Sequence, residues 1–475
     1  MDAEGFRRFG HELVDKIADY RASVATQPVR SKSEPGAIRA RLPAEPPAEP
    51  EPFENVLRDF DEIVVPGLSH WQHPRFFGYF PCNGSLSSVL GDYVSTGLGV
   101  LGLAWQSSPA LTEVEEVATD WLRRMLGLSD AWSGVIQDTA STSTLVALLC
   151  ARERASAFSL AKGGLQDCDR PLVVYASEHA HSSVDKAALL AGFGRANLRK
   201  IGVDASYAMR ADLLARAVAE DREAGRVPCA VVATTGTTTT TAFDPISAIA
   251  KVAREHGTWL HVDAAMAGSA MILPECRALW DGVEAADSLV VNPHKWLGVS
   301  FDCSAYYVRD PEHLVRVMST SPSYLRTAVD EKVKNLRDWG IPLGRRFRAL
   351  KLWFVIRHYG VEGLQHHIRE HVRLAQEFSQ WVKADDRFEL IAEPPLNLVC
   401  FRLKGDDATN QKLLDSLNAS GRMYLTHTKL DGRIVLRMSI GQTHTQDRHT
   451  EAAWAQIRAC ASSLAQQHSS HRNDD

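Results

Sequence analysis

The sequence predicts an α/β fold in which a large domain holds a mainly parallel sheet and a smaller α+β unit follows it. Two observations support this prediction. Short apolar runs of strand length recur through the middle of the chain, and helical stretches such as MRADLLARAVAEDREAG lie between several of them. The runs are LVVYAS (172–177), CAVVATTG (229–236), WLHVDAA (259–265), SLVVNP (288–293) and SAYYVRD (304–310). Strands that alternate with helices form parallel sheets covered on both faces.

The N-terminal part of the chain predicts a helix followed by an extended segment. Apolar side chains at helical spacing indicate an amphipathic helix; they are Phe6, Phe9, Leu13, Ile17, Tyr20 and Val24. The proline-rich stretch LPAEPPAEPEPF begins at Leu42 and favours an extended conformation.

Later elements are marked by their ends. In FDPISAIAKVAREHG, Asp244 is a candidate helix cap and Pro245 suits the first helical position. From about residue 366 the pattern is that of a smaller α+β unit, which ends in the helix EAAWAQIRACASSLA. The polar tail QQHSSHRNDD is expected to fray.

Composition limits the class of protein. The 475 residues are 45% hydrophobic and 23% charged, which is ordinary for a soluble globular enzyme. A net charge of −5 argues against nucleic-acid binding. The sequence has no apolar run long enough for a membrane span, and its start lacks the apolar core of a signal peptide. The eight scattered cysteines predict reduced thiols in a cytoplasm, and we expect no metal site.

One lysine stands in unusual surroundings. The stretch VVNPHKWLGV, residues 290–299, places Lys295 among strand-forming residues. A lysine amine buried against apolar groups has a lowered pKa and becomes nucleophilic. Asp263 ends the run WLHVDAA, and a buried carboxylate needs a cationic partner. The two together suit pyridoxal phosphate (PLP), since a lysine binds its aldehyde and an aspartate keeps its pyridine nitrogen protonated. The alternatives are a surface lysine and an aspartate that caps the next helix.

Three further stretches suit the same cofactor. VIQDTASTSTLVALL places small and hydroxyl residues at a strand-to-helix turn, where free amides bind phosphate or where a Ser/Thr simply caps the helix. His181, in SEHAHSSVDKA, follows a strand and can stack on a pyridine ring or be structural. TTGTTTTTAFDP offers hydroxyls after a strand, or is only a β-prone stretch.

A family resemblance runs from about residue 6 to 460. It rests on HWQHPRFFGYFP, SSPALTEVEE, HAHSSVDKA, ATTGTTTTTAFDP, WLHVDAAMAGSA, NPHKWLGVSFDCSA and IPLGRRFRALKLWFVIRHYGVEGLQ. In these motifs the chain resembles group II PLP-dependent decarboxylases. More narrowly it is similar to the aromatic-L-amino-acid decarboxylases, and most to the bacterial enzymes that act on DOPA, phenylalanine and tryptophan.

The resemblance implies a fold-type I enzyme with a mainly parallel seven-stranded sheet, and a homodimer whose active sites lie at the subunit interface. Residues 1–80 would form a helical segment that packs across the dimer. Residues 81–365 would form the large PLP-binding domain and residues 366–475 the small domain.

The resemblance also implies roles for single residues. Lys295 would bind the cofactor aldehyde, Asp263 would face the pyridine nitrogen and His181 would stack on the ring. Ala140, Ser141 and Asn292 would bind the phosphate, and Thr238 would lie near the cofactor. His294 would flank the lysine, and Asp244 would form a supporting ion pair. Tyr324, in the lid-like stretch STSPSYLRTAVDEKVKN, would donate the proton that replaces CO2.

Substrate recognition is expected from an aromatic stretch. Its members are Trp71, Tyr79, Phe80, Pro81 and Cys82, with Gly344 as a further pocket residue. An apolar aromatic wall suits a phenol, phenyl or indole ring. Phe76 and Phe77 we interpret as core residues. Two departures from the family pattern stand out: Met266 where many relatives have tyrosine, and Cys82 where the animal enzymes have threonine.

Other functions on the same fold remain open. An aromatic aldehyde synthase, in which oxygen takes part, would replace the lid tyrosine by phenylalanine or the stacking histidine by asparagine, whereas this chain keeps Tyr324 and His181. Histidine decarboxylase is a second alternative, and a catalytically silent PLP-binding protein is a third. The sequence does not rank DOPA, tyrosine, phenylalanine, tryptophan and 5-hydroxytryptophan as substrates.

Overall fold

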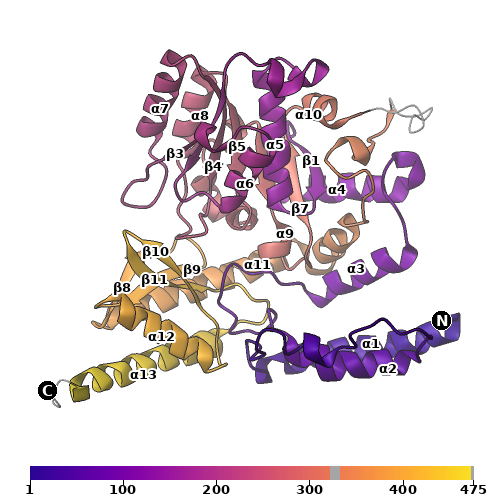
Figure 1. Cartoon of the computed structure of the whole chain (residues 1–475), viewed down its shortest axis with the longest axis vertical. Coiled ribbons are helices and arrows are strands. Elements are labelled where there is room, and N and C mark those ends of the chain that lie inside the picture. Colours follow the sequence, from indigo (N-terminus) through magenta and orange to yellow (C-terminus); the bar gives the residue numbers. More distant parts are fainter. Residues whose placement is uncertain (321–331, 472–475) are drawn as a thin grey trace. The chain divides into compact units, whose positions relative to one another are not determined.

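A computed structural model describes residues 1–320 and 332–471 (Figure 1). The chain divides into two compact units. The large unit comprises Phe80–Gln376 and Ala392–Leu398. The small unit comprises Met1–Tyr79, Glu377–Ile391 and Val399–Asp475, so both ends of the chain belong to it.

The large unit is built on a seven-stranded sheet, in the order β1-β7-β6-β5-β4-β2-β3 among the described residues. The strands are β1 (Ser133–Gln137), β2 (Leu172–Ser177), β3 (Leu198–Ile201), β4 (Val227–Thr234), β5 (Trp259–Asp263), β6 (Ser288–Val291) and β7 (Ser304–Val308). The pairings from β3 to β6 are parallel, and β7 runs antiparallel to both of its neighbours. The predicted mainly parallel sheet is confirmed, and each of the five predicted runs contains a strand.

Helices cover the sheet and thereby bury its parallel strands. Figure 1 shows α5 and α6 on one face, and α5 packs on β4, β5, β6 and β7. The helices of the large unit are α3 (Leu86–Leu98), α4 (Pro109–Met125), α5 (Ala140–Ala155), α6 (Ser182–Leu190), α7 (Ala211–Glu223), α8 (Ile246–Glu255), α9 (Pro293–Trp296) and α10 (Pro311–Met318). The long helix α11 (Ala349–Ala384) bends at Gly360, whose φ of 65° lies outside the helical range, and it continues into the small unit.

The small unit contains a four-stranded sheet in the order β10-β11-β9-β8. Its strands are β8 (Phe388–Ala392), β9 (Leu398–Leu403), β10 (Thr426–Leu430) and β11 (Arg433–Ser439), and its C-terminal helices are α12 (Asp407–Ala419) and α13 (Asp447–His471). The predicted N-terminal helix is α1 (Ala3–Ser23), which Asp2 caps by accepting a hydrogen bond from the Gly5 amide at 2.8 Å. The short helix α2 (Phe53–Asp59) follows the proline-rich stretch.

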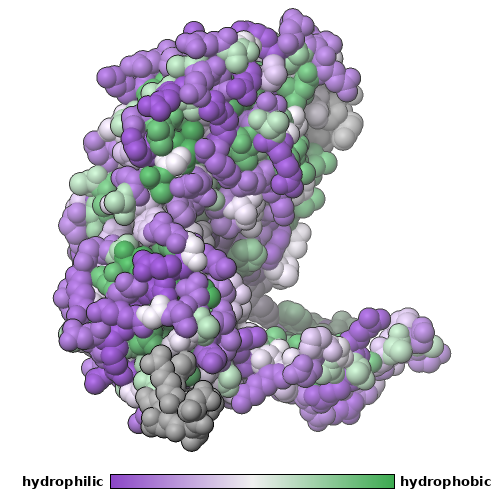
Figure 2. Space-filling model, turned by 60° about the vertical axis from the view of Figure 1, so that its left-hand side comes forward, coloured by the Kyte–Doolittle hydropathy of each residue, from purple (hydrophilic) through white to green (hydrophobic). Residues whose placement is uncertain are grey.

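Apolar side chains also reach the surface. Hydrophilic residues dominate the face seen in Figure 2, where hydrophobic residues gather in separate patches. One helix of the large unit, α3, carries an apolar stripe made of Leu86, Leu90, Tyr93, Val94 and Leu98, each 38–64% exposed. These positions recur at helical spacing and therefore share one face of α3. We call this face the α3 stripe. In the described part of the chain, no helix has the length and apolar character needed to cross a membrane.

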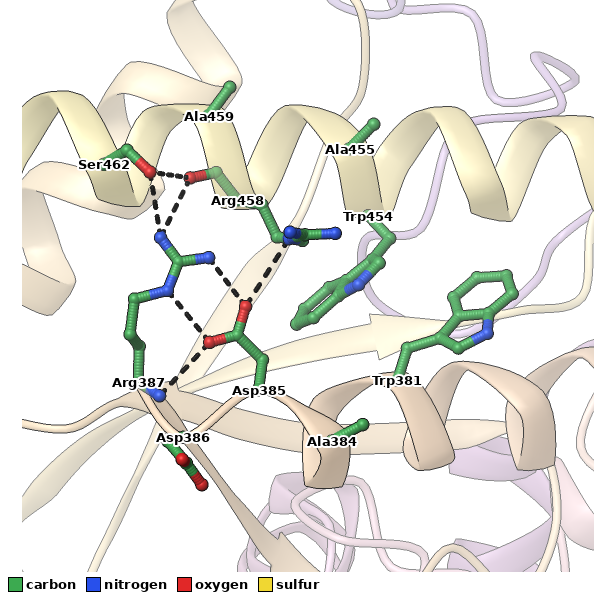
Figure 3. Close-up of a pocket in the computed structure, with 10 residues that line it drawn as sticks. All are labelled: Trp381, Ala384, Asp385, Asp386, Arg387, Trp454, Ala455, Arg458, Ala459 and Ser462. Atoms are coloured by element: carbon green, nitrogen blue, oxygen red, sulfur yellow. Dashed lines mark hydrogen bonds and ion pairs between the residues drawn. The ribbon is translucent and has the colours of Figure 1, made fainter.

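A surface pocket of about 850 Å³ lies in the small unit between the end of α11 and α13 (Figure 3). Trp381 and Trp454 line one side of it. On the other side Asp385 accepts two hydrogen bonds from the Arg387 guanidinium, at 2.9 and 2.6 Å, and Arg458 Nε lies 3.5 Å from the same carboxylate. This ion network joins the end of α11 to α13. Its side chains are partly exposed, so we expect it to contribute little to stability.

Candidate active site

The candidate site lies in the large unit at the edge where the parallel strands end. Thr234 ends β4 and pairs with Asp263, which ends β5 and pairs in turn with Val290 of β6. Helix α9, which carries Lys295, follows β6, and α6, capped by His181, follows β2. Ligands of parallel α/β sheets bind at this edge. The fold therefore brings three of the predicted residues to the same edge of one sheet.

Lys295 is held in a mostly buried junction. Pro293 starts the short helix α9, and the Lys295 amide donates to the Asn292 carbonyl at 2.9 Å. Trp296 and Leu297 are buried beside it, and the Lys295 amine lies 5.7 Å from the centre of the Phe80 ring. Burial lowers the pKa of Lys295, while the nearby Asp263 and Cys82 act in the opposite direction. This is the environment of a reactive amine and not that of a surface lysine.

Asp263 is 4% exposed. Its Oδ1 accepts a hydrogen bond from the Ala265 amide at 3.1 Å. The helix that follows starts at Ala267 with Met266 at its cap position, so Asp263 does not cap it. Its charge raises the pKa of His181 and of Lys295 against the effect of their burial. Asp263 is therefore the anionic centre of this edge.

His181 has the structural role that was one of its two predicted alternatives. It caps α6, because its Nδ1 accepts from the Ser183 amide at 3.1 Å and lies 2.8 Å from the Ser183 hydroxyl. With Nδ1 as an acceptor, the neutral ring carries its proton on Nε2. Burial lowers the pKa of His181, Asp263 raises it and Lys295 lowers it. The ring is therefore fixed in orientation and uncharged at neutral pH, and its pKa responds to the charges of both Asp263 and Lys295.

The turn from β1 into α5 presents unused helix amides. Ala140 and Ser141 are the first residues of α5, and Thr139 at the cap position makes no side-chain capping bond. This helix end therefore lacks the plain Ser/Thr cap that was the alternative. Free amides at a helix N-terminus favour an anion such as phosphate. Ala140 is also buried in an apolar cluster with Ala265, which follows β5, and with Val290 of β6. The cluster joins this turn to the strand that ends in Asp263 and to the strand that leads into α9 and Lys295.

Asn292 and His294 flank Lys295 and are both buried. The Ser304 hydroxyl donates to Asn292 Oδ1 at 2.6 Å. The Cys303 amide donates to His294 Nδ1 at 3.0 Å, and burial lowers the pKa of His294 to about 3. Both side chains are thus fixed by β7 and the loop before it, which holds the Lys295 backbone in place.

The threonine run after β4 is a hydrogen-bonded loop and not a continued strand. β4 ends at Thr234, and Thr237 Oγ1 accepts from the Ala242 amide at 3.1 Å. Thr238 lies half-buried in this loop.

The predicted roles of Asp244 as a helix cap or as an ion-pair partner are both wrong for the described residues. Its oxygens accept from the Met209 and Thr234 amides at 2.7 Å each, and burial raises its pKa to about 7.

The expected aromatic stretch divides between the units. Phe80, Pro81 and Cys82 belong to the large unit, where Phe80 is buried near Lys295. Burial raises the pKa of the Cys82 thiol, and the Lys295 charge lowers it. Trp71 and Tyr79 belong to the small unit and stack with ring centres 5.5 Å apart.

The structure places the other expected residues as follows. Phe76 and Phe77 are 2% and 0% exposed, as expected of core residues. Met266 is 1% exposed. A side chain at Gly344 would meet Leu101 at 3.2 Å, so this position is tight but not closed. Tyr324 lies outside the described residues.

Sequence reasoning missed the residues that hold the site residues in place. Ser183 fixes His181 and Ser304 fixes Asn292. His261 was missed as well: it is fully buried, two residues before Asp263 on β5, and its Nδ1 lies 2.9 Å from the Ser288 hydroxyl. Each of the three lies inside one of the family motifs, HAHSSVDKA, NPHKWLGVSFDCSA and WLHVDAAMAGSA, and that position was the available signal.

Comparison with known proteins agrees with this geometry. The sequence model of the pyridoxal-dependent decarboxylase conserved domain matches residues 35–404. Phenylacetaldehyde synthase of Arabidopsis thaliana is 43% identical, over 98% of this chain and 97% of the relative. Aromatic-L-amino-acid decarboxylase of Rattus norvegicus is 44% identical, over 98% of this chain and 99% of the relative.

Solved structures agree at the level of the fold. Oryza sativa TDC with PLP and tryptamine superposes with a TM-score of 0.95 at 40% identity, covering 98% of this chain and 99% of that one. Catharanthus roseus tryptophan decarboxylase in complex with L-tryptophan gives a TM-score of 0.92 at 40% identity, with the same coverage.

The fold and the site define a PLP-dependent enzyme of fold type I. The chain belongs to the pyridoxal-dependent decarboxylase family and is a carboxy-lyase.

The side chains at the sheet edge fit PLP. Burial lowers the pKa of the Lys295 amine, Asp263 is a buried carboxylate, and the first amides of α5 have no side-chain cap. The buried hydroxyl of Thr234, beside Asp263, has no hydrogen-bond partner in the described part of the chain. Buried polar atoms rarely remain unpaired, so an orphaned hydroxyl at this edge is consistent with a ligand there.

Proposed function

We propose that this enzyme decarboxylates aromatic L-amino acids to arylalkylamines and CO2, as a homodimer in the cytoplasm. One observation carries the proposal: the Phe80 ring lies 5.7 Å from the amine of Lys295 at the ligand-binding edge of the sheet. A ring beside the reactive amine favours an aromatic substrate over a charged one. The relatives support the same substrate class, since they include decarboxylases named for aromatic amino acids and for tryptophan.

Each proposed residue has a distinct task. Lys295 would hold PLP through its amine, Asp263 through the pyridine nitrogen, and His181 against one face of the ring. Ala140 and Ser141 would hold the phosphate, with Asn292, His294 and Thr238 supporting the site. When bound, PLP supplies an electron sink for the charge that remains on the α-carbon after CO2 leaves.

Electrostatics of the chain support these tasks. A carboxylate at Asp263 keeps a proton on the nitrogen that faces it, through a charge-assisted hydrogen bond. The neutral His181 adds no positive charge that would compete for that carboxylate. Phe80 and Trp296 are 8% and 0% exposed, so the amine of Lys295 is largely shielded from water on their side.

An aldehyde-forming reaction is the second candidate. The Arabidopsis thaliana relative is a phenylacetaldehyde synthase, and Rhodiola rosea 4-hydroxyphenylacetaldehyde synthase superposes with a TM-score of 0.91 at 37% identity. Simple decarboxylation is favoured because this chain has both His181 and Tyr324, the two positions at which the resemblance implies a change in the synthases.

The α3 stripe supports self-association. A run of large apolar residues along one exposed helix face marks an interaction surface, because leaving it in water costs free energy. A second copy of the chain would cover the α3 stripe with the same face of its own α3, as in a two-fold dimer. The cytoplasmic proposal is supported by the cysteines, all eight of which are free thiols, as expected in a reducing compartment.

A substrate panel tests the function. The holoenzyme is incubated separately with DOPA, tyrosine, phenylalanine, tryptophan, 5-hydroxytryptophan and histidine, and amine, aldehyde, CO2 and peroxide are measured. We expect equal amounts of amine and CO2 from at least one aromatic substrate, and none from histidine. Aldehyde with peroxide as the main products would establish the synthase instead. Turnover of histidine alone would exclude both.

A further inference from the structure

Residues Arg75–Tyr79, which we call the aromatic segment, are attached to the small unit's sheet. The Phe77 amide donates to the Tyr424 carbonyl at 2.9 Å, and the Tyr424 amide donates to the Arg75 carbonyl at 3.2 Å. On the other side the Ser439 amide, at the end of β11, donates to the Phe77 carbonyl at 3.0 Å. The backbone of the segment therefore has a fixed register on the sheet.

Gly78 lets the segment approach closely. A Cβ built at Gly78 would lie 2.5 Å from two carbon atoms of the Tyr424 ring, which is closer than any real contact. Only glycine allows the ring to lie against the backbone at this point. The chain that leads into Tyr79 is thus pressed against Tyr424.

Tyr79 has an unfavourable backbone conformation. Its φ is +56°, in the left-handed region that residues other than glycine rarely adopt. Such a conformation persists only where surrounding contacts hold it. Here the Tyr79 amide donates to Thr426 Oγ1 at 3.2 Å, the Tyr424 hydroxyl donates to the Tyr79 hydroxyl at 3.3 Å, and the Tyr79 ring stacks on Trp71.

Thr426 is the centre of these contacts. Its hydroxyl oxygen accepts from the Tyr79 amide and, at 2.9 Å, from Nη1 of Arg437. A hydroxyl has two lone pairs and satisfies both donors at once. Arg437 is 4% exposed on β11, so the hydroxyl is fixed from the rigid side of the sheet. Tyr79 itself is 50% exposed, and its backbone amide is held by the Thr426 hydroxyl.

We propose that Thr426 is a positioning residue for aromatic substrates: its hydroxyl holds Tyr79 in the left-handed conformation and thereby sets the Trp71–Tyr79 ring stack. This inference rests on the proposed function. The next residue, Phe80, is linked to Tyr79 by one peptide bond and carries the ring near Lys295. Loss of the Thr426 hydroxyl would release Tyr79 and weaken the Trp71–Tyr79 stack, two rings that the family resemblance assigns to substrate recognition, and the substrate ring would bind less tightly.

The test compares Thr426→Val, which keeps the shape and removes the hydroxyl, with Thr426→Ser, which keeps the hydroxyl. Thr428→Val is the matched control, because Thr428 is a half-buried threonine two residues further along β10. We expect Thr426→Val to raise KM for the best aromatic substrate about threefold to tenfold, as for a lost hydrogen bond. The kcat and the absorbance of bound PLP should stay near wild type, and Thr426→Ser should restore KM.

Near-ultraviolet circular dichroism measures the ring stack without substrate, and Thr426→Val should weaken that signal. An unchanged KM in Thr426→Val would overturn the proposal, and so would an equal rise in Thr426→Ser or Thr428→Val. A fall in kcat or PLP content with unchanged KM would also overturn it, since it would indicate a general loss of structure. Failure of the proposed function has a different signature, because the wild type itself would then turn over no aromatic amino acid.

Discussion

Lys295 owes its character to its position one turn after β6, where burial lowers the pKa of its amine and Asp263 partly restores it. We predict that Lys295→Ala abolishes turnover and removes the absorbance of bound PLP at the visible edge. Far-ultraviolet circular dichroism should remain that of the wild type, because alanine adds neither charge nor bulk at this buried position. Normal turnover in this variant would refute the assignment of the site.

Asp263 is predicted to act through charge. Asp263→Ala should lower kcat by more than about tenfold, ~1.4 kcal/mol of transition-state stabilisation, because an unprotonated pyridine is a poor electron sink. The same change should lower the pKa of Lys295 further, since Asp263 raises it. Because bound PLP would occupy the amine, this shift is measured on the PLP-free enzyme, as the pH dependence of the reaction of Lys295 with an amine reagent. Asp212→Ala, on the surface of α7, is the control for loss of a carboxylate, and equal effects of the two variants would contradict the role of Asp263.

Tyr324 lies outside the described residues, and its role is a proposal from the sequence. If it donates the proton that replaces CO2 on the α-carbon, Tyr324→Phe should lose amine and gain aldehyde, ammonia and peroxide under air. Only one oxygen atom is removed, so KM should change little. Product analysis is the measurement. An unchanged amine yield without peroxide would assign the proton to another donor, with His181 or a water as the next candidates.

At the scale of elements, the α3 stripe makes a prediction about assembly. Leu90 is 50% exposed at its centre, and Leu90→Glu places a charge where we propose apolar contact with a second copy. We expect light scattering after size exclusion to show a dimer for the wild type and a shift toward monomer for the variant. Leu190→Glu is the matched control, because Leu190 is 68% exposed at the end of α6 and outside the stripe. If both variants remain dimeric, the interface lies elsewhere.

The elements also show what the sequence could and could not reveal. The central strands were predictable because they are continuous apolar runs, as buried parallel strands must be. β3 was missed because it is an edge strand whose Arg199 and Lys200 read as surface residues. Asp244 was predicted wrongly because the sequence around it is typical of a helix cap, whereas its actual contact is with Met209, 35 residues earlier in the chain. Their position at strand ends made His181 and Asp263 candidates, whereas Ser183 and Ser304, which bond His181 and Asn292, lie in the same motifs but are small hydroxyl residues without a distinctive pattern.

For the whole molecule we predict a loss of stability on mild acidification. Burial lowers the pKa of His73 and His261 to about 4 and that of His294 to about 3, from an ordinary value of 6.5. The folded protein then binds protons less tightly than the unfolded chain. Stability is therefore full above pH 6.5 and falls as the pH drops toward 4, by up to about 1.4 kcal/mol per pH unit for each histidine. Asp244, with its pKa raised to about 7, acts in the opposite direction but is a single group.

Urea unfolding at several pH values between 4 and 7 measures this slope. His261→Gln should make the slope shallower, while His11→Gln, an exposed position on α1, serves as the control. A slope that is the same in both variants would show that His261 does not take up its proton on unfolding.

The small unit is assembled from the two ends of the chain, and this has a consequence for biosynthesis. Tyr79 and its partner Tyr424 are 345 residues apart in sequence. At typical rates of translation a ribosome needs on the order of 20–70 s to add the intervening residues. During that interval the large unit has emerged from the ribosome and can fold, but the aromatic segment has no sheet to join. A nascent chain therefore completes the scaffold of the catalytic amine before it can order Trp71 and Tyr79, and a chain truncated before β10 would retain the first and never gain the second.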